Sequence, residues 1–193
     1  MRGQAHTLEA VIGAVLLVSS LVFALQATAV TPLSASTSNQ HIENQQRASA
    51  AGVLTAAQEA GALQEAVLYW NDSEAEFHDA EQERDYYTNG YPPNEFGNIT
   101  ERAFEGRGLA VNVEIYSEPG DDDPQRMVYR GAPSDNAVSA SRTVTIYNGS
   151  ELTAPGTSTT VENANTFNET VPYDGAGGNV YNVVRVEVTV WRM

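Results

Sequence analysis

The chain has 193 residues and a formal net charge of −15, from 25 acidic residues against ten arginines and no lysine. So few cations argue against a nucleic-acid partner, because binding requires Lys and Arg to neutralise phosphates. The absence of Cys excludes disulfides, thiolate metal sites and a lipidated cysteine anchor. An acidic surface without lysine suits a very salty medium, in which ions screen the repulsion among carboxylates.

The first thirty residues are the most distinctive part of the chain. Arg2, Gly3 and Gln4 precede an acidic residue, Glu9, and the stretch from Ala10 to Val30 then carries no charge. About 20 such residues span a bilayer as a helix. Arg2 is the only cation nearby, so we expect the N-terminus in the cytoplasm and the rest of the chain outside.

A polar stretch separates this segment from a second helical region. Thr31-Pro32 and the polar residues 34–40 predict that the helix is interrupted or kinked. Helix formers dominate from His41 to Trp70, with apolar residues at three- and four-residue steps. These residues are Ile42, Ala50, Val53, Ala57, Ala60, Leu63 and Val67.

The remainder of the chain favours short helices, loops and β-strands. Residues 73–97 predict a loop with one short helix, residues 98–107 another short helix, and residues 151–170 a loop. Alternating apolar residues predict strands at 109–116, 137–147 and 179–191, and residues 127–130 a short fourth strand. In the last strand Val184, Val186, Val188 and Val190 share one face, whereas Arg142 interrupts the apolar face of residues 137–147.

A long helix followed by antiparallel strands predicts an α+β fold, in which the amphipathic helix covers one face of a small sheet. We therefore divide the chain into a leader and processing region (1–9), a transmembrane helix (10–30), a polar hinge (31–40) and an extracellular α+β head domain (41–193).

The pattern from Arg2-Gly3-Gln4 to Leu8-Glu9, followed at once by an uncharged helix, resembles the N-terminus of type IV prepilins, and most closely that of haloarchaeal pilin-like proteins. The resemblance implies that a prepilin peptidase cuts after Gly3, leaving Gln4 as the first mature residue. Glu9 would be the family's assembly glutamate, although it would stand sixth in the mature chain rather than fifth.

The resemblance also implies a structural subunit of a surface filament, with an adhesive role if it is a minor pilin. Its partners would be other pilin subunits, the pilus membrane platform and the lipid bilayer. A monomeric, membrane-anchored envelope or binding module is the alternative.

Two other ways of processing the N-terminus remain open. A secretory signal peptide would end at Ala27-Thr28-Ala29, so that the mature chain begins at Val30. An uncut signal anchor would leave the N-terminus at or near Met1.

Other patterns are weaker. Four N-x-[ST] sequons, at Asn71, Asn98, Asn148 and Asn168, are candidate glycosylation sites that we expect in turns or loops. We predict no enzyme, cofactor or metal site, since the three histidines are scattered, no nucleophile motif occurs and Asp121 to Asp123 are typical of a solvated turn. The aromatic residues between 86 and 96 favour packing against a sheet edge over an adhesive loop.

The charge balance predicts that the folded domain gains stability in molar salt. The Debye length falls from about 10 Å at 0.1 M to roughly 3 Å at 1 M, which removes repulsion among the acidic side chains. We expect the melting temperature to rise with KCl concentration. A melting temperature that stays flat or falls would contradict the inference of a salt-adapted surface.

Overall fold

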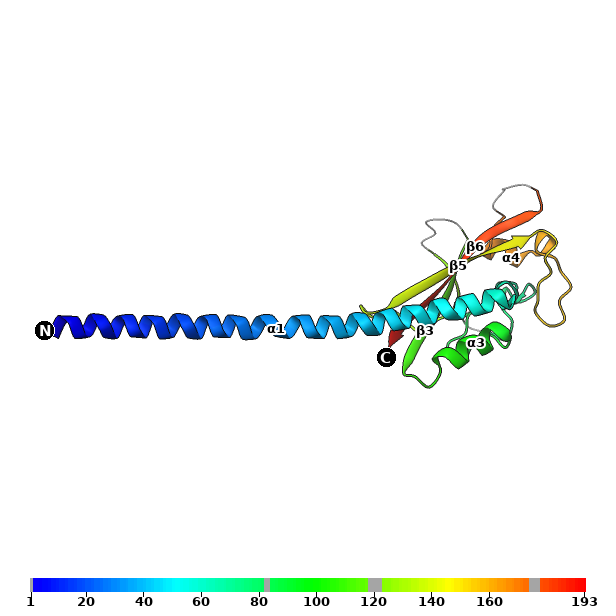
Figure 1. The fold of residues 1–193 in the computed structure, drawn as a ribbon. Coiled ribbons are helices and arrows are strands. Elements are labelled where there is room, and N and C mark those ends of the chain that lie inside the picture. The colour runs from blue at the N-terminus through cyan, green and yellow to red at the C-terminus, as the bar shows by residue number, and fades with distance from the viewer. Residues whose placement is uncertain (1, 82–83, 118–122, 174–177) are drawn as a thin grey trace. The chain divides into compact units, whose positions relative to one another are not determined.

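The computed structural model describes residues 2–81, 84–117, 123–173 and 178–193, with side chains from residue 6 onward except at 27–39. The chain divides into two compact units, Met1–Ile42 and Glu43–Met193; we call the second the head unit. Helix α1 (Arg2–Glu59) supplies the first unit and the first helix of the head unit (Figure 1). Helix α1 continues through residues 31–40, so the predicted interruption at Thr31-Pro32 is wrong.

The predicted helix from 41 to 70 is two helices in the head unit. α1 ends at Glu59, and α2 (Ala62–Val67) follows Gly61, whose φ of 72° requires a residue without a side chain. Most of the predicted apolar stripe is buried. Ala60 is exposed, because the chain leaves the helix at this point.

Four antiparallel strands form the main sheet, in the order β4-β3-β6-β5. They are β3 (Leu109–Tyr116), β4 (Gln125–Val128), β5 (Val138–Tyr147) and β6 (Val180–Arg192). The predicted strands at 109–116, 137–147 and 179–191 are confirmed to within a residue at each end, and the short strand lies two residues earlier than predicted. β6 is central, with Val188 paired with Val113 of β3 and with Ala140 of β5.

One face of this sheet forms the core of the head unit. Val184, Val186, Val188 and Val190 are fully buried, as the alternation predicted. They share a core with the buried residues of α1 and α2, so the predicted α+β arrangement of a helix on an antiparallel sheet is confirmed (Figure 1).

The opposite face of the sheet is polar. Arg185 on β6 forms an ion pair with Glu187 and lies 3.9 Å from the centre of the Tyr116 ring. Asn112 is buried, accepts a hydrogen bond from the Arg130 backbone (2.8 Å) and donates one to the Gly131 carbonyl (3.0 Å). These two bonds fix the segment that follows β4 over this face.

Smaller elements complete the head unit. They are β1 (Trp70–Asn71), β2 (Glu76–Phe77), α3 (Glu95–Phe104), a 3-10 turn (Val161–Asn163) and α4 (Thr166–Thr170). The helix predicted at 98–107 thus begins three residues earlier, where Asn94 accepts a hydrogen bond from the Gly97 N–H and caps it. Residues 151–170, predicted as a loop, contain the 3-10 turn and α4. The start of α4 is held by a residue outside this segment, Asp72.

The carboxylate of Asp72 holds the start of α4. It accepts hydrogen bonds from the backbone N–H groups of Asn165 (3.0 Å), Thr166 (2.8 Å) and Phe167 (3.1 Å), and from the Thr166 hydroxyl (2.8 Å). Burial raises the pKa of Asp72, but these hydrogen bonds outweigh burial and hold the pKa below its ordinary value.

Replacing Val186 by Asp should unfold or strongly destabilise the head unit. The change buries an unpaired carboxylate in the core, at a cost of several kcal/mol, roughly the whole stability of a marginal domain. The control is Val183→Asp on the same strand, since Val183 is 48% exposed. Thermal melts compare the two variants, and equal tolerance would mean that the faces of β6 are misassigned.

Asp72→Asn should lower the free energy of unfolding by about 1–3 kcal/mol at neutral pH, because charged hydrogen-bond acceptors are the stronger ones. The pKa of Asp72 is depressed in the native state, so its contribution is complete above the unfolded pKa of about 3.9. It is lost as the pH falls through the lower native pKa. Chemical denaturation across this range should show wild type and variant converging in acid, while exposed Asp135→Asn has little effect at any pH.

Candidate functional site

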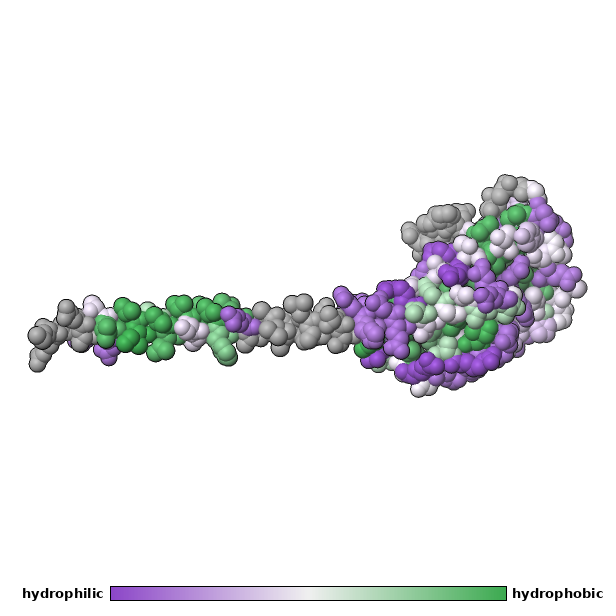
Figure 2. All heavy atoms as spheres, viewed as in Figure 1, coloured by the Kyte–Doolittle hydropathy of each residue, from purple (hydrophilic) through white to green (hydrophobic). Residues whose placement is uncertain are grey.

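The segment from His6 to Gln26 is the most unusual surface of the chain. Its 21 residues are long and apolar enough to cross a membrane, and none of them is buried. Phe23 is 75% exposed and Leu17 73% exposed. Figure 2 shows hydrophobic residues gathered along this segment, whereas hydrophilic residues form much of the visible surface of the head unit. A contiguous apolar surface of this kind marks a membrane or protein contact.

Small residues lie together on one face of this segment. At 100° per residue, Ala10, Gly13, Ala14, Ser20 and Ala24 fall within an arc of about 120°, which also contains the exposed side chains of Leu17 and Leu21. A Cβ added at Gly13 would meet nothing within 4 Å in this chain. The Ser20 hydroxyl donates to the Leu17 carbonyl (2.9 Å), which satisfies this polar group within the helix. Ser20 therefore brings no unpaired hydroxyl to a helix that packs against this face.

Glu9 stands where this apolar surface begins. Its carboxylate is 3.8 Å from Nδ1 of His6, and both side chains are 82% exposed. The helix dipole favours anions in the first turn of a helix. α1 starts at Arg2, so Glu9 lies beyond that turn and gains little from the dipole. Gly3 and Gln4 lie in that first turn, where the structure describes only the backbone.

The four sequons are less alike than the sequence suggested. Only Asn148 lies in a turn, while Asn71 is in β1, Asn98 in α3 and Asn168 in α4, so the expectation of turns or loops is wrong for three of them. These short polar segments form a strand and two helices because each also carries a buried aromatic residue, Trp70, Phe96 or Phe167. Asn168 is held on both sides of its amide, which donates to the Ala164 carbonyl and accepts from the Tyr181 hydroxyl.

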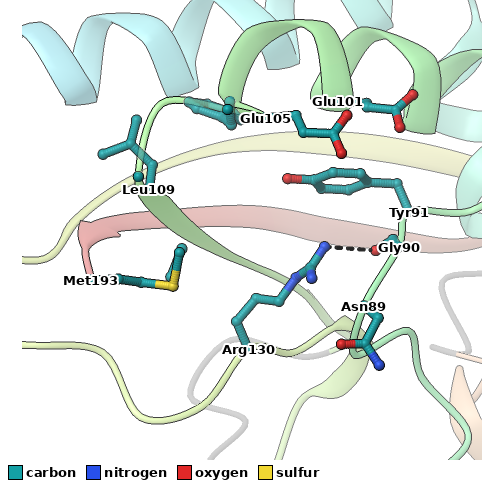
Figure 3. A pocket seen from close by; sticks show the side chains of 12 residues that line it. Asn89, Gly90, Tyr91, Glu101, Glu105, Leu109, Arg130 and Met193 are labelled. Carbon is teal, nitrogen blue, oxygen red and sulfur yellow. Dashed lines mark hydrogen bonds between the residues drawn. The ribbon is translucent and has the colours of Figure 1, made fainter.

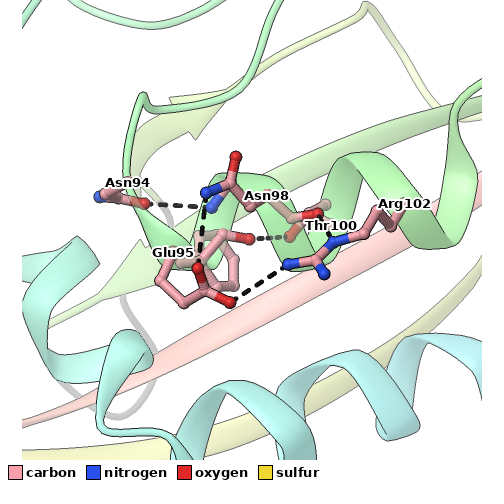
Figure 4. A network of polar contacts seen from close by, with 7 residues as sticks. Asn94, Glu95, Asn98, Thr100 and Arg102 are labelled. Carbon is pink, nitrogen blue, oxygen red and sulfur yellow. Dashed lines mark hydrogen bonds and ion pairs between the residues drawn. The ribbon is translucent and has the colours of Figure 1, made fainter.

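Asn98 belongs to a polar network on α3 (Figure 4). Its amide is exposed, 3.5 Å from a Glu95 oxygen, and Glu95 also pairs with Arg102 at 3.2 Å. Thr100, the third residue of the sequon, is fully buried and donates to the Phe96 carbonyl (2.8 Å). The folded helix therefore presents the asparagine but not the hydroxyl of this sequon.

The aromatic residues between 86 and 96 are largely internal. Tyr87 and Phe96 are buried in the core, and Tyr86 packs edge-on against Tyr129 with ring centres 5.7 Å apart. This packing was the favoured expectation, and it leaves few aromatic side chains for an adhesive loop. Asp121 and Asp122, expected in a solvated turn, lie outside the described residues.

A pocket of about 360 Å³ opens beside α3 (Figure 3). Arg130 donates to the Gly90 carbonyl (3.0 Å) and lies 5.2 Å from the centre of the Tyr91 ring, with Glu101 and Glu105 on the far side of that ring. The lining contains no His, Ser or Cys, and within the described residues no three metal-binding side chains gather. The pocket thus offers charges of both signs but no nucleophile with a neighbouring base.

Comparison with known proteins adds the family. No curated protein and no solved structure matches the chain. Residues 2–190 match the model of a family of unknown function, DUF7288. The match includes both the apolar segment and nearly all of the head unit, so these two parts belong to one shared architecture. The chain is a member of the DUF7288 family.

Proposed function

We propose that the protein is a membrane-anchored, pilin-like structural subunit of a surface filament. The observation that carries the proposal is the exposed apolar segment from His6 to Gln26, which follows Arg2-Gly3-Gln4 and precedes a folded head unit. The segment holds the precursor in the lipid bilayer with its N-terminus in the cytoplasm. The acidic head unit then lies outside the cell, where its charge keeps it soluble.

The short leader gives the anchor a second use. A prepilin peptidase that cuts after Gly3 releases a positively charged amine on Gln4. Glu9 lies on the same helix, and a carboxylate entering hydrocarbon is costly unless it is paired. The amine of a neighbouring subunit supplies that pair, and the small-residue face allows the helices to pack closely, as small residues do between membrane helices.

This role needs no catalysis by the chain itself. Its partners are the prepilin peptidase, other pilin subunits, the pilus membrane platform and the lipid bilayer. A monomeric envelope module is the second candidate, and one observation favours it. After cleavage at Gly3, Glu9 is the sixth mature residue, one position later than in the pilins that the N-terminus resembles.

The first test is the mature N-terminus, measured by mass spectrometry on protein purified from membranes. We expect it to be Gln4, and Gly3→Leu to accumulate as a longer precursor because a bulky side chain blocks the peptidase. Gly13→Leu is the matched control, since a Cβ at Gly13 meets no atom within 4 Å, Gly13 lies away from the cleavage site, and processing should continue. A native N-terminus at Val30 would exclude the pilin-like proposal.

The second test separates the subunit from the monomeric module. Glu9→Gln should leave cleavage and membrane insertion intact but lower the ratio of protein in sheared filaments to protein in membranes. The matched control is Glu59→Gln, at the other end of α1, which should leave the ratio unchanged. An unchanged ratio for Glu9→Gln, or no filament-associated wild type, would favour the monomeric module.

A further inference from the structure

The sheet of the head unit has two outer strands, β4 and β5. An outer strand presents unpaired backbone groups to which another strand can add. At β4 the Tyr87 N–H donates to the Met127 carbonyl (2.9 Å), and the Tyr129 N–H donates to the Tyr87 carbonyl (3.0 Å). The backbone around Tyr87 therefore occupies that edge.

At the β5 edge, side chains occupy backbone carbonyl groups. Gln58 of α1 donates to the Thr143 carbonyl (3.5 Å), and Gln64 of α2 donates to the Thr145 carbonyl (3.2 Å). Arg142 donates to the Ser141 carbonyl (3.2 Å). Residues 141, 143 and 145 alternate along an antiparallel strand, so their carbonyls point to the same side, away from β6. Each of these three carbonyls has a side-chain donor.

Arg142 is also the residue that interrupts the apolar face of β5. Its guanidinium reaches the Thr55 hydroxyl on α1 (3.1 Å), and Arg142 stays exposed, although on the same face Val144 is buried and Ala140 is half-buried. Charged residues on the inner side of an outer strand oppose pairing, because a second strand would have to cover the charge. If two copies of β5 paired in antiparallel fashion about Arg142, the two guanidinium groups would also repel each other.

The rest of β5 favours such pairing. Residues 138–147 contain no acidic side chain, no Pro and several β-branched residues, in a chain whose net charge is otherwise strongly negative. We propose that Gln58, Gln64 and Arg142 form an edge guard that prevents β5 of a second copy from adding to β5. When these three side chains are removed, the strand that would add to β5 is β5 of a second copy. Acidic side chains repel two copies elsewhere on the chain, but β5 carries none.

The test uses the full chain in detergent micelles and the variant Gln58→Ala/Gln64→Ala/Arg142→Val. Sedimentation should show the variant at twice the mass of wild type or more, rising with protein concentration. Hydrogen exchange should show new protection of the outward amides within residues 139–145. Arg107→Val, at an exposed arginine away from both edges, is the matched control and should behave as wild type.

Two further measurements keep the outcome decisive. The near-ultraviolet signal of the buried Trp70 and Trp191 shows whether each variant is folded. Gln58→Ala/Gln64→Ala leaves β5 unchanged and should self-associate to an intermediate degree, whereas Arg142→Lys keeps the charge and should not. A wild-type mass in both guard variants, or new protection confined to α1, would overturn the inference. Neither result bears on the anchoring proposal, which concerns residues 6–26.

Discussion

The burial of one face of the sheet under α1 and α2 is the constraint on which the head unit depends. β6 pairs with both β3 and β5, so its four valines at 184, 186, 188 and 190 lie at the centre of the core. Buried residues of α1 and α2, among them Ala50 and Ala57 of α1, belong to the same core as these valines. That placement brings Gln58 and Gln64 to the edge of β5. The guard on that edge is thus a consequence of how the core is covered.

Long-range polar contacts fix the segments that the apolar core does not reach. Asp72 binds three successive backbone N–H groups at the start of α4, more than ninety residues away in sequence. Asn112 performs a similar task for the chain after β4, and Thr153 donates to the Glu65 carbonyl (2.7 Å). Each such hydrogen bond adds only modestly to the free energy of unfolding, but loss of one partner leaves a desolvated polar group unpaired, which is costly. The bonds therefore specify one arrangement of these polar loops.

In the proposed role the two parts of the chain lie in different surroundings, one in lipid and one in water. Residues 6–26 present apolar side chains with no core of their own, which suits lipid or the helices of other subunits. The head unit buries its apolar residues internally and exposes a strongly acidic surface. If both sheet edges are closed, contacts between subunits fall to the N-terminal helix and to the outer surfaces of the head units rather than to strand pairing.

The apolar segment, the antiparallel strands and the buried face of β6 could all be predicted from the sequence, because each depends on the spacing of apolar residues along the chain. The sequence also singled out Arg142, Glu9 and Gly3, as a break in a pattern, an early acid and a small residue before a helix. It misplaced α3, whose start is set by the Asn94 cap, and Gly97 is needed there because a Cβ would lie 1.9 Å from the Pro92 carbonyl oxygen. The sequence could not show which short polar segments form helices or strands, or which side chains cover the edge of β5. Both depend on tertiary contacts, because the groups that bind Thr143, Thr145 and the start of α4 lie 81 to 95 residues away.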